Sequence, residues 1–279
     1  MDPATSFKLL DTICRVIGYA RGPQREEDLA RARVVGEAKG TLDAIQLYRE
    51  AGLNELALQH SNVVDVAKRA TSMLTTEANP EEVSVDWIRN FYDKCRLTSD
   101  EEMKSLWAKI LAGEANSPGT FSKRTVTLVG QLDKSDAEDF SRVASFILEG
   151  TEPVLFIKNW SHSIFCDAGI THKLLLRLQD AGLLNSETWN GYRVDGTEQA
   201  INFRYFGKIF RMTRTDTFKS EPLVPSIFFL TTSGKQLYPV SGPTEQPKFL
   251  EYLMFAFLED KQRGWTASVI EGGGANPPV

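Results

Sequence analysis

The sequence predicts an α+β protein in which a mainly helical first half is followed by a mixed domain. Apolar residues recur at helical spacing through most of residues 7–147. After Gly150-Thr151-Glu152-Pro153 the pattern changes to short segments rich in aromatic and β-branched residues, which favour strands. The 279 residues are enough for more than one compact unit. We expect four parts, over residues 1–78, 79–150, 151–271 and 272–279.

The first part is expected to contain long helices. Apolar residues at helical spacing over 7–19 predict a helix that Gly22-Pro23 ends. Residues 24–74 contain no proline and are rich in Ala, Glu, Arg, Leu and Gln. They indicate two or three long helices, or one long helix broken near Gly52. A helical hairpin and a coiled-coil dimer would both bury the apolar stripe.

The second part is expected to be a compact helical module. Helical patterns that begin with a polar residue and continue with an apolar stripe start near Ser84, Ser99 and Asp133, and a further helix is predicted over 121–132. Ser99 followed by Glu102 fits a capping box, and the pattern that starts near Asp133 runs to Ile147. Trp87 and Trp107 fall on the apolar stripes, so we expect both in the core.

The joint at residues 113–122 is more polar than a linker needs to be. We therefore predict a partner-binding loop there, because functional residues concentrate on loops. The candidate residues are Glu114, Asn116, Ser117, Lys123 and Arg124.

The third part alternates strands with helices. Helices are predicted over 164–184, 231–238 and 248–261. Strands are predicted over 154–157, 192–193, 200–206, 208–213, 226–230 and 264–270, and residues 272–279 are expected to form a flexible tail.

Residues 169–185 resemble the second helix of a helix-turn-helix, and the strands after them would form a wing. We therefore expect a winged-helix-like domain. In such domains the exposed helix face enters the major groove of DNA. Here that face would present Thr171, His172, Lys173 and Arg177. Two cations are few for phosphate contacts, and winged helices also bind proteins, so both uses stay open.

The hairpin at 201–214 is the strongest candidate for an anionic partner. Basic residues alternate with aromatic ones, a pattern that clamps single-stranded nucleic acid in some proteins. The alternative is a sheet with its aromatic rings inside and its cations in solvent. The basic residues are Arg204, Lys208, Arg211 and Arg214.

No catalytic motif, metal site or cofactor site is recognisable. His162, Cys166 and His172 supply three metal ligands where structural zinc sites use four. Catalysis by a hydrolase would require His162, Cys166 and Asp167 to share one pocket. Acidic clusters stand at expected helix starts, where capping explains them. We therefore expect no enzyme activity and no cofactor.

Composition and charge further limit which functions and cellular locations the sequence predicts. The net charge of −5 and the lack of a polybasic tail argue against strong non-specific nucleic-acid binding. No apolar run approaches the ~20 residues that cross a bilayer, and the N-terminus lacks the pattern of a secretory signal. Three widely spaced cysteines fit a reducing compartment. We expect a cytoplasmic protein.

The compact module also resembles a known family. The segments VDWI, SDEEM, LWAKILAGE and SPGTFSKRT at 85–88, 99–103, 106–114 and 117–125 are similar to the bacterial and prophage family called domain of unknown function 2806. The helix at 106–112, with the following Leu-Asp-x-x-Asp-Ala pattern at 132–137, is more loosely similar to the abortive-infection protein Abi-alpha. These resemblances imply a role in phage defence or prophage competition, and they supply no catalytic residues.

Together these patterns lead to two functional expectations. The first is a non-enzymatic interaction protein that binds a protein partner or self-associates, in phage defence or prophage competition. The alternative is a nucleic-acid-binding protein that uses the winged-helix-like unit and the hairpin at 201–214.

Overall fold

The chain combines helices and sheets, which confirms the predicted α+β class. The fold is taken from a computed structural model that describes residues 5, 8–9, 11–13, 42–157, 159–186, 200–214, 228–259 and 265–271. Contacts divide the chain into two compact units, residues 1–134 and 135–279, and each is described by itself. The finer division into four parts stays a prediction.

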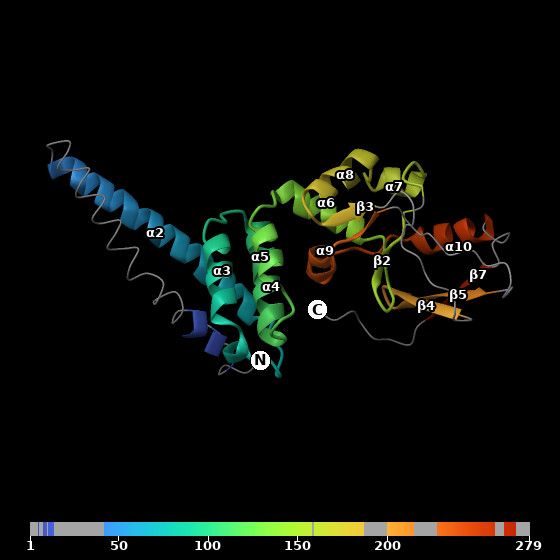
Figure 1. The fold of residues 1–279 in the computed structure, drawn as a ribbon, viewed down its shortest axis with the longest axis horizontal. Helices are drawn as coiled ribbons and strands as arrows, with labels where there is room; N and C mark the ends of the chain where they lie inside the picture. Colours follow the sequence, from blue (N-terminus) through green and yellow to red (C-terminus); the bar gives the residue numbers. More distant parts are fainter. Residues whose placement is uncertain are drawn as a thin grey trace. The chain divides into compact units, whose positions relative to one another are not determined.

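Helices build the first unit (Figure 1). The elements are α2 (Leu42–Thr71), the 3-10 helix η1 (Pro80–Glu82), α3 (Val85–Cys95), α4 (Glu101–Asn116) and α5 (Lys123–Val129). Helix α2 packs against α4, and α3 packs against α5. The break expected near Gly52 is wrong, because α2 is continuous over 30 residues. No helix among the described residues is long and apolar enough to cross a membrane.

Aromatic rings form the centre of this unit. Trp87 stacks on Phe91 with ring centroids 5.2 Å apart, and Phe91 meets Trp107 edge-on at 5.3 Å. Each indole N–H is satisfied, by the carbonyl of Phe121 at 2.7 Å and by the hydroxyl of Thr98 at 3.0 Å. The prediction that both tryptophans belong to the core is confirmed.

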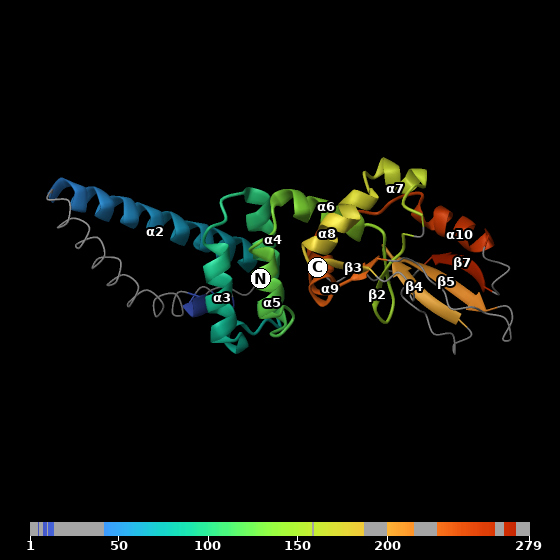
Figure 2. The ribbon, with the colours of Figure 1, turned by 45° about the horizontal axis from the view of Figure 1, so that its top comes forward.

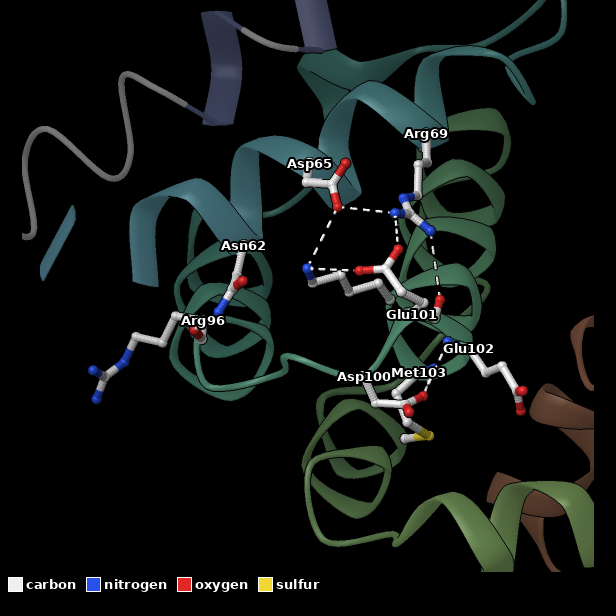
Figure 3. Close-up of polar contacts among 9 residues, drawn as sticks. Asn62, Asp65, Arg69, Arg96, Asp100, Glu101, Glu102 and Met103 are labelled. Carbon is white, nitrogen blue, oxygen red and sulfur yellow. Dashed lines mark hydrogen bonds and ion pairs between the residues drawn. The ribbon is translucent and has the colours of Figure 1, made fainter. Parts of the chain in front are cut away.

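Helix α4 begins at a carboxylate. Asp100 Oδ1 accepts from the backbone N–H groups of Glu102 and Met103, at 2.9 and 3.0 Å (Figure 3). The expected capping box from Ser99 is therefore wrong. An aspartate suits the position because one carboxylate oxygen satisfies two orphan donors at the positive end of the helix. These hydrogen bonds, from Met103 first, lower the pKa of Asp100.

Four charges join α2 to α4 (Figure 3). Arg69 pairs with Asp65 at 3.0 Å and also with Glu101. Lys104 lies 3.1 Å from Glu101 and 3.6 Å from Asp65, so each cation meets both carboxylates. Burial tends to raise the pKa of Asp65, but Arg69 and Lys104 outweigh it, and the net pKa is lowered. The hydrogen bond from Arg69 lowers the pKa of Glu101.

A buried carboxylate holds the joint between α4 and α5. Glu114 is 3% exposed, and its two oxygens accept from the N–H groups of Gly119 and Phe121, each at 2.8 Å. The Phe121 ring packs on Gly113, where an added Cβ would lie 2.8 Å from the ring. The joint is therefore fixed by specific contacts inside the unit.

The second unit alternates helices and strands. Its helices are α6 (Lys134–Ala144), α7 (Ser163–Asp167), α8 (His172–Asp180), α9 (Thr232–Leu237), the 3-10 helix η2 (Tyr238–Val240) and α10 (Phe249–Glu259). Its strands are β1 (Ile147–Glu149), β2 (Pro153–Leu155), β3 (Leu184–Ser186), β4 (Ala200–Tyr205), β5 (Lys208–Arg214), β6 (Phe228–Leu230) and β7 (Trp265–Glu271).

Most elements predicted for this unit are confirmed, and two are corrected. The helix expected to reach Ile147 ends at Ala144, because Ile147 opens β1 and pairs with Leu155. The helix expected over 164–184 is divided into α7 and α8 at Gly169, which adopts a φ of 72° that other residues rarely accept. The strand expected at 192–193 and the tail at 272–279 lie outside the described residues.

Two antiparallel sheets organise these strands. The larger has the order β2-β1-β4-β5-β7, and the smaller consists of β3 and β6. Helix α10 lies along β7 (Figure 2). Phe249 at its start contacts Tyr205 of β4, with centroids 5.1 Å apart. Phe203, Tyr205 and Phe210 thus belong to a core between the sheet and its helices.

We predict that Glu114→Gln destabilises the first unit. The amide keeps one acceptor but places an NH2 group beside a backbone N–H, so a buried donor loses its partner. We expect the free energy of unfolding to fall by about 2 kcal/mol, measured by urea denaturation followed by circular dichroism. Glu82→Gln, at an exposed position of η1, is the matched control. Equal stability of the two variants would contradict the role of Glu114.

We also predict acid sensitivity from the four charges between α2 and α4. The folded-state pKa values of Asp65 and Glu101 are lowered, so the stability they contribute is present above the ordinary carboxyl pKa of about 4. It is lost as pH falls through the folded-state values. Arg69→Gln should therefore reduce the difference in urea midpoint between about pH 7 and about pH 3. Arg89→Gln is the control, and an identical pH dependence in both variants would refute the prediction.

Candidate functional site

Helix α8 presents a narrow exposed face. Leu174, Leu175 and Leu178 are buried, and the hydroxyl of Thr171 caps the helix by accepting from the N–H of Leu174 at 3.2 Å. The exposed residues are His172, Lys173, Leu176, Arg177 and Asp180, and Leu176 is 43% exposed. The amphipathic pattern thus displays one leucine among polar groups.

Arg177, a predicted nucleic-acid contact, is held by carboxylates of α6. It lies 3.4 Å from Asp136 and also forms an ion pair with Asp139. The Asp139 side chain is 4% exposed and is bound by Arg142 as well. Gly169 packs on this group, because a Cβ there would lie 2.8 Å from Arg142 Nη1. Arg177 therefore fastens α8 to α6, while Lys173 stays exposed.

The residues considered as metal ligands make ring and hydrogen-bond contacts instead. His172 stacks on Trp160 at 4.9 Å, and His162 caps α7 by accepting from the N–H of Ile164 at 3.3 Å. Cys166 is exposed, and its thiol lies 3.6 Å from the carbonyl of Trp160. Within the described ranges, no group of three or more potential ligands is placed to hold a metal ion.

The four basic residues of the hairpin at 201–214 do not share one face. Arg204 and Arg211 are exposed on the outer face of the sheet, where Arg211 Nε donates to Asn202 across the strands at 2.8 Å. Lys208 stands opposite buried Tyr205 and pairs with Glu245 at 2.7 Å. Arg214 ends β5, and its side chain is outside the described part of the molecule.

The aromatic residues of the hairpin face inward. Phe203, Tyr205 and Phe210 are at most 4% exposed. The Tyr205 hydroxyl donates to the carbonyl of Ser145 at 2.9 Å and accepts from the N–H of Gln246 at 2.8 Å. Burial raises the pKa of this tyrosine. In this conformation these three rings are core residues and offer no stacking surface.

The predicted partner loop combines structural and exposed residues. Glu114 holds the loop, and Asn116 joins α4 to the end of α2 by accepting from the N–H of Thr75 at 2.9 Å and donating to the carbonyl of Met73 at 3.0 Å. The exposed candidates are Ser117, Lys123 and Arg124. Any partner surface of this loop would therefore consist of those three residues and their exposed neighbours.

A cleft lies between α7 and the start of α10, with a volume of about 590 Å³. One wall contains the His162 ring, which contacts the Tyr252 ring at 4.6 Å. Asp167 also lines the cleft, whereas Cys166 is not among its lining residues, so the three residues of the hydrolase hypothesis do not gather there. The lining consists of His162, Ser163, Ile164, Asp167, Ala168, Gln246, Pro247, Lys248, Glu251, Tyr252 and Phe255.

Sequence reasoning missed this cleft, although one signal was present. Apolar residues occur on more than one side of the α10 sequence FLEYLMFAFLE, so burial of a single stripe cannot cover all of them. Among the apolar residues of α10 whose burial is described, Phe255 is left largely uncovered, with 63% of its surface exposed. Its side chain lines the cleft.

Comparisons with known proteins identify the family. No curated protein and no solved structure matches the chain. A family model matches residues 48–254, from within α2 to the middle of α10, which is more than half of the sequence. The chain therefore belongs to the family described as protein of unknown function (DUF2806).

Proposed function

We propose that this protein is a non-enzymatic interaction protein that self-associates through the outer face of α8. The supporting observation is the exposed triad Lys173, Leu176 and Asp180. These residues stand at positions i, i+3 and i+7, so they share one side of the helix. Along this side of the helix a cationic and an acidic side chain stand on either side of an apolar one.

This arrangement is complementary to itself. Two copies of α8 that pack antiparallel about a two-fold axis near Leu176 bring Lys173 of each copy opposite Asp180 of the other. The two leucines then meet at the centre of the contact. An interface with closed two-fold symmetry uses the same patch on both subunits, which is the condition that this face meets.

The fold around α8 supports a winged-helix-like unit used for protein contact. Helices α7 and α8 are joined at Gly169, and β3 follows α8 and pairs with β6 as a wing would. In a DNA complex the α8 face would approach the phosphates, which would repel the negative charge of Asp180. Arg177 could not compensate, because it already forms ion pairs with the carboxylates of Asp136 and Asp139. The local charges therefore favour a protein contact over a DNA contact.

The setting that we propose is phage defence or prophage competition. Its support is the similarity of the α4 sequence and of residues 132–137 to the abortive-infection protein Abi-alpha. A protein that acts by assembly fits such a role, since self-association couples activity to concentration without a catalytic step.

We predict that charge reversal on α8 disrupts self-association and that a double swap restores it. Lys173→Asp places two acids opposite each other, and Asp180→Lys places two cations opposite each other. The variant with both changes recovers opposite charges. Light scattering after size-exclusion chromatography should show a lower mass for each single variant and the parental mass for the double variant, with and without added DNA.

The control is Glu77→Lys, an exposed charge reversal in the first unit. Plaque counts in a phage-sensitive bacterial host that expresses each protein give the functional readout. We expect protection from the parent, the control and the double variant, and none from the single variants. A monomeric parent, or single variants with the parental mass, would rule out the α8 interface.

Nucleic-acid binding is a second candidate, favoured by Arg204 and Arg211 on one exposed sheet face. We predict that a binding surface built on these arginines loses affinity steeply between about 50 and about 200 mM salt. The double variant with Arg204→Glu and Arg211→Glu should lose binding to labelled single-stranded DNA in fluorescence anisotropy. Arg89→Glu serves as the control, and unchanged binding by the double variant would exclude this face.

A further inference from the structure

We infer that the cleft between α7 and the start of α10 binds a peptide segment of a partner protein, in which a bulky apolar side chain stands next to a basic one. The cleft shares no lining residue with the outer face of α8. The inference is therefore independent of self-association through that face.

The apolar part of the cleft selects the bulky side chain. Five lining residues are apolar or aromatic over most of their surface: Ile164, Ala168, Pro247, Tyr252 and Phe255. The exposed Phe255 ring lies with them, so a partner side chain that enters the cleft would also cover this ring. The volume of about 590 Å³ lies within the range of ligand pockets and accommodates one or two side chains of a peptide.

The charged part of the cleft selects the basic side chain. Asp167 from α7 and Glu251 from α10 line the same cleft, and both are exposed. Within the described part of the chain, neither carboxylate has a hydrogen bond or ion pair. Lys248 supplies one cation, so the carboxylates of the lining outnumber its ammonium groups. Nearby aromatic rings add a favourable surface for a guanidinium or ammonium group.

The wall that holds the peptide is ordered before binding. The His162 ring is fixed on one side by accepting the N–H of Ile164 at Nδ1 and on another by its contact with Tyr252. A neutral ring that accepts at Nδ1 carries its proton on Nε2, where it is a donor for a peptide carbonyl. Tyr252 itself is only 9% exposed. Such a preformed wall lowers the entropy cost of binding.

Three pools of fluorescein-labelled peptides test the inference on the full-length protein. Each pool has randomised flanks around a fixed pair, which is Phe-Arg, Phe-Glu or Gly-Arg. Anisotropy titrations should show at least about tenfold tighter binding of the Phe-Arg pool than of either other pool, a difference of about 1.4 kcal/mol. Equal binding of the three pools, or no binding of the Phe-Arg pool up to about 1 mM protein, would overturn the inference.

Variants place the binding in the cleft. Glu251→Lys should weaken the Phe-Arg pool about tenfold and strengthen the Phe-Glu pool, because the lining changes from a net negative to a net positive charge. Phe255→Ala should weaken both phenylalanine pools and leave the Gly-Arg pool unchanged. Glu77→Lys is the charge-reversal control, and both test positions are exposed, so folding should be retained in thermal melts. If Glu251→Lys binds the pools as Glu77→Lys does, the peptide site is not in this cleft.

Discussion

A carboxylate that is removed from water must be matched by donors or cations, and this requirement organises both compact units. Glu114 gives its two oxygens to backbone N–H groups of one loop, which fixes the path from α4 to α5. Asp139 is bound by Arg142 and Arg177, which fixes α6 against α8. Removing a partner of such a carboxylate leaves a buried charge without compensation, and the free energy of unfolding falls by several kcal/mol. The position of the α8 face therefore depends on Asp139 of α6.

Local patterns were sufficient to predict most elements. The periodicity of α3 and α6 and the alternation of β4 and β5 are strong because each of these elements buries one side. The resemblance of residues 169–185 to the second helix of a helix-turn-helix pointed to a boundary near Gly169, but the periodicity did not, because apolar residues continue on both sides of it. In the sequence, Asp139 stands between other polar residues and Phe140 on an amphipathic helix. Its burial depends on Arg177, which is 38 positions away in the sequence, and no local pattern encodes that contact.

The candidate sites show the same limit. A basic and aromatic hairpin was correctly located, but strand register decides which of its cations share a face, and the register places Arg204 opposite Ile209. The cleft brings residues 162–168 beside residues 246–255, which the sequence separates by almost 80 positions. Juxtapositions of this kind follow from the topology of the sheets. Composition and spacing carried no information about them.

The topology of the two sheets also constrains how the second unit is made. The chain leaves the small sheet after β3, builds β4 and β5 in the large sheet, and returns to the small sheet only at β6. One edge of strand β5 pairs only with β7, which follows β6 and α10 in the sequence. During synthesis β5 is an open edge until residues 265–271 emerge, and such edges pair readily with other chains. The newly made second unit is therefore vulnerable to misassembly until residues 265–271 are released and pair with β5.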